Sequence, residues 1–598
     1  MLKRPTKRIL FSVSWLIMSH LAAQSQLPPQ PDWKGKSESW MLPAKHPAAT
    51  AFERSGGKQG AEYKACMSYI DSLSARHPEL RYRAIGKTAG QRDLHLVAVG
   101  ENPDLLLQGQ RRPDRPLLLF QAGIHSGEID GLDAGLMFIR EMLSGRLRSL
   151  QKQVDFLLVP ALNRDGLDRL SAFSRINQNG PEKQGWRSNA LNQNLNRDYM
   201  KLDSPELKAL IPLIHRLNPE LYIDIHVTDG ADYQYDITYG GMTAGAHSAR
   251  VSRWLNEDLR SFVDGALRQN GHIPGPLVFL KNELKPDSGL VQYAFSPRFS
   301  HAYADVCGIP ALLIENHSLK PFRQRVCGTL VLMEALCRKV VEDFRKLDSL
   351  RRLDRENAAS TVPLEWSFPR HATDSLDFRA VEYDLKSSPL AGTQYPAWNA
   401  KPYTVKIPVL QQDSLVKSLS MPSAFYVPAA RIDVIERLKK HGIELEVLPN
   451  DTSIRLRTFR FAQIQAAKSA FQGRFRMSGN ASVTEEWHRL HAGSVKVSTR
   501  QPLGRLACLL LHPDSPDSFF QWGFFADITE RTEYFETYAM APLAEALAKE
   551  HPEWLKSFEE KCAADEAFRN NPDARLRWWY ERSAYHDAYF MRYPIGMQ

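Results

Sequence analysis

The sequence predicts an α/β fold in which helices cover a largely parallel sheet. Four short runs that are apolar on both faces alternate with segments of helical periodicity. Such runs are typical of parallel strands that helices bury on both sides. The chain has 598 residues, too many for one ordinary hydrophobic core, so we expect more than one domain.

The expected elements follow in order along the chain. A helix over 63–73 precedes two strand-like runs, 80–85 and 94–99. The four apolar runs are 116–121, 154–159, 221–227 and 310–315. Helical patterns cover 132–142, 205–216 and 328–347. We therefore expect one domain over residues 35–347.

The C-terminal part has a different pattern. Residues 348–375 are charged and then contain Pro and Ser, which predicts a linker. Residues 376–598 predict an accessory α+β region, with a strand, a helix and a strand over 424–448, short strands over 452–497 and helices after 529.

Residues 1–23 have the pattern of a secretory signal peptide. Basic residues at the start precede an apolar run over 9–23 that ends in small residues. The mature protein would then be exported, either periplasmic or secreted. An uncleaved anchor is the alternative, although serines and a histidine make the run weakly apolar and short for a span. No later stretch suits a bilayer, so we expect no transmembrane span after signal removal.

The composition, with 43% apolar and 24% charged residues, fits a folded protein. The net charge of +9 is spread along the chain without a dense Lys/Arg block, so we expect no nucleic-acid partner. The six cysteines lack C-x-x-C spacing, which excludes a disulfide scaffold and a cysteine zinc site. Cys307 and Cys327 could pair, or all six could be buried thiols. Nothing in the sequence indicates an oligomeric state.

The first metal-like signal is the pair His125 and Glu128. H-x-x-E alone is weak, since about one match is expected by chance in a chain with 18 histidines. The pair directly follows the first apolar run, however, and ligands of open α/β sheets bind beyond the carboxyl ends of the strands. Flanking glycines allow the backbone to turn sharply there.

Two further strand ends complete the candidate site. A catalytic zinc needs three protein ligands, and His226, which ends the third run, is the best third ligand. Glu315 ends the fourth run, where burying a carboxylate without a reason is costly. It could act as general base and then as acid for the leaving amine. The alternative for His226 is a buried, hydrogen-bonded histidine without a metal, and the alternative for Glu315 is a glutamate in a salt bridge at the edge of the sheet.

Polar loops between these strands carry two arginine motifs. Arg187 follows Trp186, and an arginine near the metal can stabilise the oxyanion that develops on an attacked carbonyl. Asn196 with Arg197 can bind a substrate carboxylate through charge-assisted hydrogen bonds. The alternative for each arginine is a solvated loop residue.

The order of these motifs resembles the zinc carboxypeptidase superfamily of the carboxypeptidase A type, over about residues 62–347. The C-terminal region is similar to the extensions of some large bacterial members. The resemblance implies a three-layer α/β/α fold with a mixed, mostly parallel eight-stranded sheet. It also implies one zinc ion per chain on His125, Glu128 and His226, with Glu315 as the base and proton shuttle. Arg187 would polarise the carbonyl, and Asn196 with Arg197 would bind the terminal carboxylate.

The sequence departs from the family at Asn194 and leaves two of its residue assignments open. Asn194 stands where the family often has an aspartate that orients a zinc-bound histidine. The amide oxygen of Asn194 can still accept a hydrogen bond from that histidine, but it carries no negative charge. Tyr293 is our choice for the family's mobile substrate-binding tyrosine, with Tyr303 as the alternative. Arg175 is an alternative to Arg187.

The function predicted is a zinc metallocarboxypeptidase that hydrolyses C-terminal peptide bonds with a zinc-bound water and a glutamate base. An amidase or endopeptidase on cell-wall (murein) peptides is the alternative within the same chemistry. A peptide-binding protein without activity is a third possibility, but no ligand or base is missing from the motifs.

Overall fold

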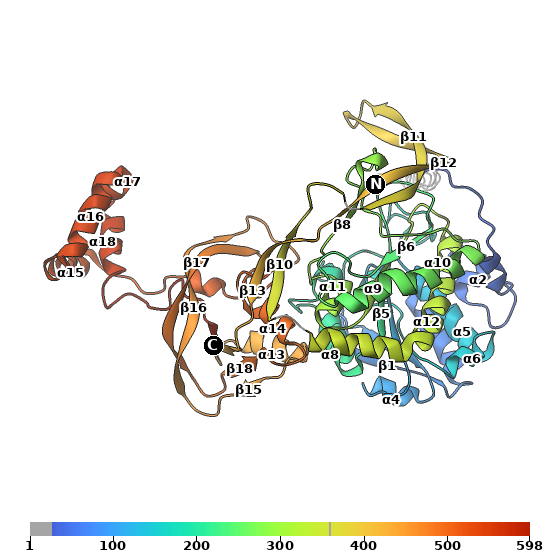
Figure 1. The fold of residues 1–598 in the computed structure, drawn as a ribbon, viewed down its shortest axis with the longest axis horizontal. Helices are drawn as coiled ribbons and strands as arrows, with labels where there is room; N and C mark the ends of the chain where they lie inside the picture. Colours follow the sequence, from blue (N-terminus) through green and yellow to red (C-terminus); the bar gives the residue numbers. More distant parts are fainter. Residues whose placement is uncertain (1–26, 358–359, 373) are drawn as a thin grey trace, which may run out of the picture. The chain divides into compact units, whose positions relative to one another are not determined.

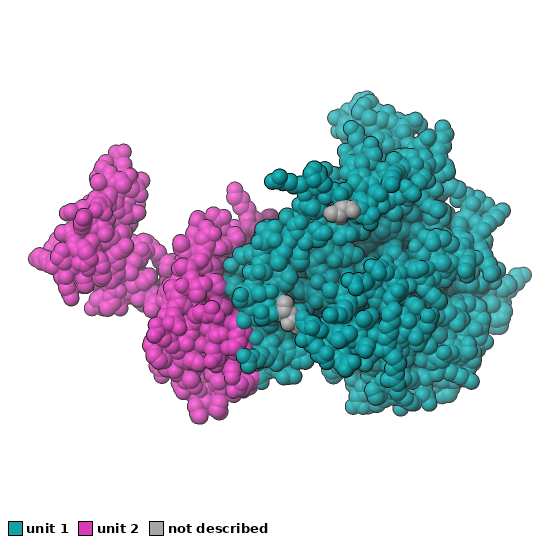
Figure 2. All heavy atoms as spheres, viewed as in Figure 1, with its two compact units in different colours: residues 1–421, 433–445, 498–518 teal, residues 422–432, 446–497, 519–598 magenta. Residues whose placement is uncertain are grey.

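A computed structural model describes residues 27–357, 360–372 and 374–598. The expected signal peptide, residues 1–23, lies outside the described residues. The chain forms two compact units (Figure 2). Unit 1 comprises residues 1–421, 433–445 and 498–518, and unit 2 comprises residues 422–432, 446–497 and 519–598. Unit 1 therefore takes in part of the region that we expected to be accessory.

An eight-stranded mixed sheet forms the centre of unit 1, and three of its strands, β1, β5 and β6, are labelled in Figure 1. Its strand order is β1-β2-β4-β3-β5-β9-β6-β7. The four middle strands run parallel to one another, and β6 and β7 form a fourth parallel pair. This confirms the α/β prediction. The strands are β1 Leu80–Lys87, β2 Asp93–Val99, β3 Leu117–Ala122, β4 Asp155–Val159, β5 Leu221–Val227, β6 Ile237–Gly240, β7 Pro274–Gly275 and β9 Ala311–Asn316.

Helices pack on both faces of this sheet. The main core combines one face of β3, β4 and β5 with apolar side chains of α3, α5, α9, α10 and α12. Helix α11 contacts β5 and β9, and α8 contacts β1. The helices are α3 Tyr63–Ser74, α5 Asp130–Ser144, α8 Pro205–Leu217, α9 Ala249–Trp254, α10 Arg260–Gln269, α11 Ser300–Val306 and α12 Phe322–Glu356. No helix in the described part of the chain is long and apolar enough to span a membrane.

Strand β5 shows how the sequence separates core from site. Leu221, Ile223 and Ile225 belong to the main core. Successive side chains of a strand point to opposite faces, so Asp224 and His226 point away from this core. The end of β5 therefore presents two polar side chains on one face.

Residues 348–375, expected as a linker, carry regular structure. Helix α12 continues to Glu356 because Arg351 is buried and donates to the side chain of Asn218 and, over 3.3 Å, to the carbonyl of Pro219. Strand β10 (Thr361–Ser367) and the start of β11 (Asp374–Ser388) follow. β11 forms a long hairpin with β12 (Thr393–Gln411), and β12 pairs with β8 (Leu290–Gln292), which precedes β9 in the chain.

Unit 2 contains a six-stranded sheet in the order β15-β18-β14-β19-β16-β17. Residues 452–497, expected to form short strands, instead hold the long hairpin of β16 and β17. Helices follow after residue 529, as predicted. The elements are β14 Ala424–Val427, β15 Glu446–Val447, β16 Thr452–Ala466, β17 Met477–Leu490, β18 Val495–Ser498, β19 Gly596–Met597, α15 Thr537–Glu550, α16 Pro552–Ala564, α17 Glu566–Arg569 and α18 Pro572–Tyr580.

Candidate metal centre and its cavity

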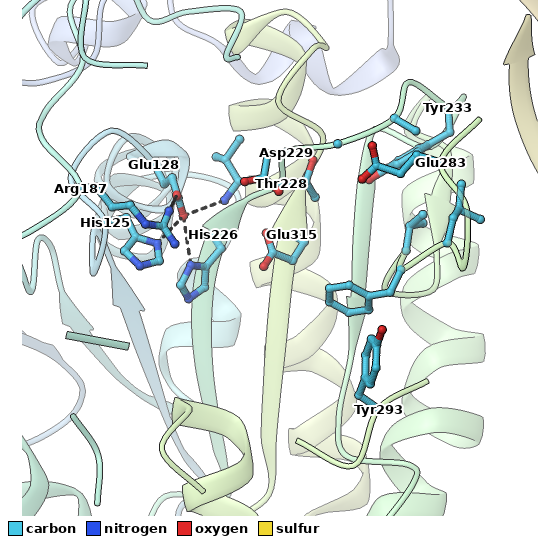
Figure 3. A pocket seen from close by; sticks show the side chains of 16 residues that line it. His125, Glu128, Arg187, His226, Thr228, Asp229, Tyr233, Glu283, Tyr293 and Glu315 are labelled. Carbon is cyan, nitrogen blue, oxygen red and sulfur yellow. Dashed lines mark hydrogen bonds and ion pairs between the residues drawn. The ribbon is translucent and has the colours of Figure 1, made fainter. Parts of the chain in front are cut away.

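Three side chains meet at the carboxyl ends of β3 and β5. His125, Glu128 and His226 each offer a ligand atom, and these atoms lie within 4.8 Å of one another (Figure 3). All three side chains are buried. Two imidazole nitrogens and one carboxylate oxygen are the donor set of many catalytic zinc sites. The residues therefore fit a single divalent ion such as zinc.

The loop after β3 can place His125 and Glu128 because glycines let it turn. Gly123 has φ of 60°, a left-handed conformation, and a β-carbon there would lie 3.2 Å from the Cα of Ala161. A β-carbon at Gly127 would lie 2.7 Å from Cγ of Arg175. The close packing of this loop thus depends on residues without side chains.

One oxygen of Glu128 is the common neighbour of the two histidines. Its Oε2 atom lies 3.1 Å from Nδ1 of His125 and 3.0 Å from Nδ1 of His226. The backbone N–H of Val227 also donates to Oε2, over 3.2 Å. Both rings thus turn the same nitrogen toward the point where the three ligand atoms converge.

The second nitrogen of each ring has a partner behind it. His125 Nε2 lies 2.9 Å from Oδ1 of Asn194, and His226 Nε2 lies 2.8 Å from Oδ2 of Asp224. Such partners fix the tautomer and the orientation of a metal-binding histidine. Asn194 was singled out from the sequence, but Asp224 was missed. The signal was present, since Asp-x-His in a strand puts both side chains on one face.

The electrostatics of the three ligands differ. Burial lowers the pKa of His125. Burial also opposes the charge on His226, but Asp224 and Glu128 outweigh it and hold its pKa well above the usual value. In the same way, the histidines and Arg175 hold the pKa of Glu128 well below its usual value despite burial. The carboxylate of Glu128 is therefore ionised at neutral pH.

Glu315 lies beside this cluster on the neighbouring strand. In the parallel pairing of β5 and β9, His226 and Glu315 are directly opposite each other. Both line one cavity (Figure 3). Burial, with a further contribution from Glu128, raises the pKa of Glu315 to about 8. A carboxyl group with such a pKa can both accept and return a proton near neutral pH.

Two arginines share the other oxygen of Glu128. Arg175 Nη2 lies 2.8 Å and Arg187 Nη1 lies 3.2 Å from Oε1. The side chain of Arg175 is only 13% exposed, whereas that of Arg187 is 45% exposed and lines the cavity. Of the two arginines, Arg187 is therefore the more exposed and the one that lines the cavity.

The expected substrate-binding residues lie in different surroundings. Asn196 is buried, with Nδ2 3.4 Å from Nε2 of His226, and its Oδ1 accepts the backbone N–H of Ser300. The guanidinium of Arg197 lies 4.3 Å from the centre of the Phe299 ring. Tyr293 is 42% exposed and lines the cavity, so the structure brings it together with Arg187 and Glu315.

The residues of the cavity that were not predicted include Asp229, Tyr233 and Glu283. Asp229 follows β5, and Glu283 lies on the loop before β8 (Figure 3). Tyr233, four residues after Asp229 in the chain, is buried. No sequence motif marks these residues, because only the folded chain brings the two loops together.

Residues 66–268 match the sequence model of the family described as zinc carboxypeptidase. This segment is thus similar to zinc carboxypeptidases. It contains the three candidate ligands together with Arg187, Asn196 and Arg197. Tyr293 and Glu315 lie C-terminal to the matched segment.

Several curated relatives and solved structures that are similar to this chain at low sequence identity are named carboxypeptidases. Carboxypeptidase 2 of Trichophyton tonsurans is 21% identical over 426 residues, which cover 67% of this chain and 73% of the relative. A metallo-carboxypeptidase structure from Burkholderia cenocepacia has 16% identity and a TM-score of 0.34, covering 47% of this chain and 69% of its own. A metallo-carboxypeptidase structure from Pseudomonas aeruginosa has 18% identity and a TM-score of 0.34, and the match covers 47% of this chain and 68% of that chain.

Proposed function

We propose that the protein is a zinc-dependent carboxypeptidase that removes C-terminal residues from peptides. The observation that carries the proposal is the convergence of His125, Glu128 and His226 at one point, with Glu315 opposite His226 on the next strand. A bound zinc ion would act there as a Lewis acid and would make an attacking water more acidic. The similar curated relatives, which are named carboxypeptidases, support the choice of reaction.

The residues in and near the cavity would have different roles in the reaction. Glu315 takes the proton of the attacking water and passes it to the nitrogen of the leaving amine, a role that suits a pKa of about 8. Arg187, half-exposed in the cavity, donates to the oxygen of the attacked carbonyl. Asn196 and Arg197 bind the terminal carboxylate, and Tyr293 closes over the substrate. For Arg197 to bind the carboxylate, its side chain has to move away from the Phe299 ring, or the substrate has to reach the guanidinium where it now lies.

The proposal includes export with one zinc ion per chain and a peptide as the substrate. The signal pattern of residues 1–23 supports export to the periplasm or the medium. The resemblance of the C-terminal region to extensions of large bacterial members supports a bacterial source.

The test combines metal content with product analysis. The purified protein is incubated with dipeptides that have blocked N-termini and apolar, acidic or basic C-terminal residues. We expect one zinc per chain and release of the single C-terminal residue. Bound zinc without any such release would exclude an exopeptidase, and cleavage only inside cell-wall peptides would favour the amidase alternative.

The role of Glu315 is tested by Glu315→Gln. We expect turnover to fall by about 10²–10⁴-fold with the zinc content unchanged, because the amide cannot accept the proton. Glu365→Gln, on β10 and outside the cavity, is the matched control and should keep full turnover. Full turnover in Glu315→Gln would show that another group is the base.

A further inference from the structure

Two segments from the C-terminal region belong to unit 1. The match to the zinc carboxypeptidase model ends at residue 268, yet residues 433–445 and 498–518 lie in the same compact unit as the candidate metal centre. A buried polar side chain from each segment, His441 and Asp517, contacts residues 296–303. This stretch includes the start of α11, which contacts β5 and β9.

Asp517 holds the first residues of this stretch. Its carboxylate is buried and accepts a hydrogen bond from the hydroxyl of Ser296, and its Oδ2 lies 2.9 Å from Nε of Arg298. The backbone of Asp517 has φ of 61°, in the left-handed region that residues other than glycine adopt at a cost. A buried carboxylate is also costly unless it is paired. The contacts with Ser296 and Arg298 therefore fix residues 296–298 to the segment that carries Asp517.

His441, which directly follows α13 (Ile432–Lys440), holds the other end of the stretch. Its Nε2 lies 3.0 Å from the carbonyl oxygen of Met200, which can only accept, so Nε2 carries a proton. Burial lowers the pKa of His441 to about 3, so the ring is neutral and its Nδ1 accepts from the hydroxyl of Tyr303, over 2.7 Å. The oxygen of Tyr303 then accepts from Nε2 of His215, over 2.8 Å. Each hydrogen bond in this buried chain thus has a defined direction.

The residues between these two ends touch both side chains that we propose to bind the terminal carboxylate. The guanidinium of Arg197 lies 4.3 Å from the centre of the Phe299 ring. The backbone N–H of Ser300 donates to Oδ1 of Asn196, over 3.1 Å. A shift of residues 296–303 would therefore remove the support of Asn196 and Arg197.

Asp517 also affects the charge of this neighbourhood. Burial lowers the pKa of Arg197 to about 10, with contributions from Arg187 and Arg298, and Asp517 opposes this shift. Like charges disfavour one another, so the carboxylate of Asp517 helps three guanidinium groups to stay close together. Its negative charge by itself would weaken the binding of a substrate carboxylate, whereas its contacts with the 296–298 backbone would strengthen it. The two effects therefore have opposite signs and can be separated by experiment.

We propose that Asp517 and His441 are positioning residues for the carboxylate-binding site, because they hold residues 296–303 against Asn196 and Arg197. The inference rests on the proposed peptidase function. It adds that the C-terminal region helps to build the substrate site instead of forming only an accessory part. Both residues act through Phe299 and Ser300, and neither lines the cavity beside Glu315.

The test measures substrate binding and metal access separately on the zinc-loaded, full-length protein. Blocked dipeptides give KM and kcat, and inhibition by acetohydroxamate, which binds zinc without a carboxylate, reports the metal. We expect Asp517→Asn to raise KM about tenfold, while kcat and the inhibition constant of acetohydroxamate stay within about twofold. The zinc content should not change, because Asp224 keeps its hydrogen bond from Gln121.

Two milder variants complete the test and keep it available if Asp517→Asn does not fold. Ser296→Ala removes a contact of Asp517 without changing any charge, and Tyr303→Phe removes the hydroxyl that binds His441. Both should raise KM in the same way. Asp514→Asn, on the same segment and paired with Lys417 at the surface, is the matched control and should leave KM unchanged.

The contrary outcomes are distinct. A KM that is unchanged or lowered in Asp517→Asn and unchanged in Ser296→Ala would mean that Asp517 acts by charge alone, and would overturn this inference. Equal losses for the dipeptide and for acetohydroxamate would overturn it as well, since they indicate general damage to the site. An unchanged KM in Tyr303→Phe would overturn the role of His441. If the zinc-loaded wild type releases no C-terminal residue, the proposed function fails and this inference fails with it.

Discussion

The two histidines of the candidate metal centre are supported by different partners. Behind His125 lies the neutral amide of Asn194, whereas behind His226 lies the carboxylate of Asp224. A carboxylate makes an imidazole more basic and holds it more firmly than an amide does. Asp224 helps to hold the pKa of His226 well above its usual value against burial, whereas burial lowers the pKa of His125. The β5 side of the centre should therefore bind the metal more strongly than the β3 side.

The support of His226 also extends further into the protein. Asp224 accepts hydrogen bonds from Gln121, over 2.8 Å, and from the hydroxyl of Ser300, over 2.5 Å. These partners come from β3 and from the first residue of α11, so two elements besides β5 fix this carboxylate. Asn194 instead belongs to a loop and also accepts the backbone N–H of Asn196.

Removing the ligand on the stronger side should have the largest effect. We expect His226→Ala to lose the metal, with an affinity loss well above the about 10–100-fold that removal of an outer partner costs. Zinc content after dialysis and a competition titration with a chelator measure this. Retained stoichiometric zinc in a folded His226→Ala protein would remove His226 from the ligand set.

Asp224→Asn should come next. The amide keeps the size of the side chain but removes its charge, which makes the His226 side resemble the His125 side. We expect zinc affinity to fall about 10–100-fold. A chelator competition on the wild type and the variant measures it, with Asp377→Asn, a cavity-remote aspartate of β11, as the matched control. An unchanged affinity would show that the difference between the two sides has no consequence for the metal.

Asn194→Asp should have a smaller effect in the opposite direction. Both acceptor contacts of the side chain can remain, and the added charge supports His125. We expect zinc affinity to rise, by up to about tenfold, because the second imidazole becomes more basic. The same chelator competition measures this. A weaker affinity would show that the loop needs the amide for another contact.

The sequence was sufficient to predict that the three candidate ligands converge, because each one ends or follows a recognisable apolar strand. The alternation within β5 could also have indicated Asp224, which shares a face with His226. The short strands β6 and β7 were not predicted, since four and two residues are too few to show a period.

The convergence of Asp229 and Glu283 on one cavity could not be predicted from sequence. The β11–β12 hairpin makes hydrogen bonds with Gln234 and with the carbonyl of Leu284, which lie near these two residues in the chain, and β12 pairs in parallel with β8. Such pairing joins segments far apart in the chain, and no local pattern specifies it. Residues beyond 348 thus contact the loops that line the cavity.

Another histidine–carboxylate pair, outside the candidate metal centre, provides a reference for the comparison. Asp232 Oδ1 lies 3.0 Å from Nε2 of His317 and 3.0 Å from Nζ of Lys320, and none of these residues belongs to the candidate ligand set. Burial would raise the pKa of Asp232, but the contacts with His317 and Lys320 outweigh it and lower the pKa to about 2. This pair should stabilise the fold without affecting the metal.

We expect Asp232→Asn to leave zinc affinity unchanged, the smallest effect in the series, while it lowers the free energy of unfolding by about 2 kcal/mol at neutral pH. Because the folded pKa lies below that of an unfolded aspartate, this stability is present above about pH 4. It is then lost as the pH falls through 2.

Urea denaturation from pH 7 downward measures this. The difference in the free energy of unfolding between wild type and variant should close only at acid pH. A gap that stays constant with pH would mean that packing, and not the charge of Asp232, stabilises this region. A fall in zinc affinity would instead make the reference pair part of the metal centre and end its contrast with the Asp224–His226 pair.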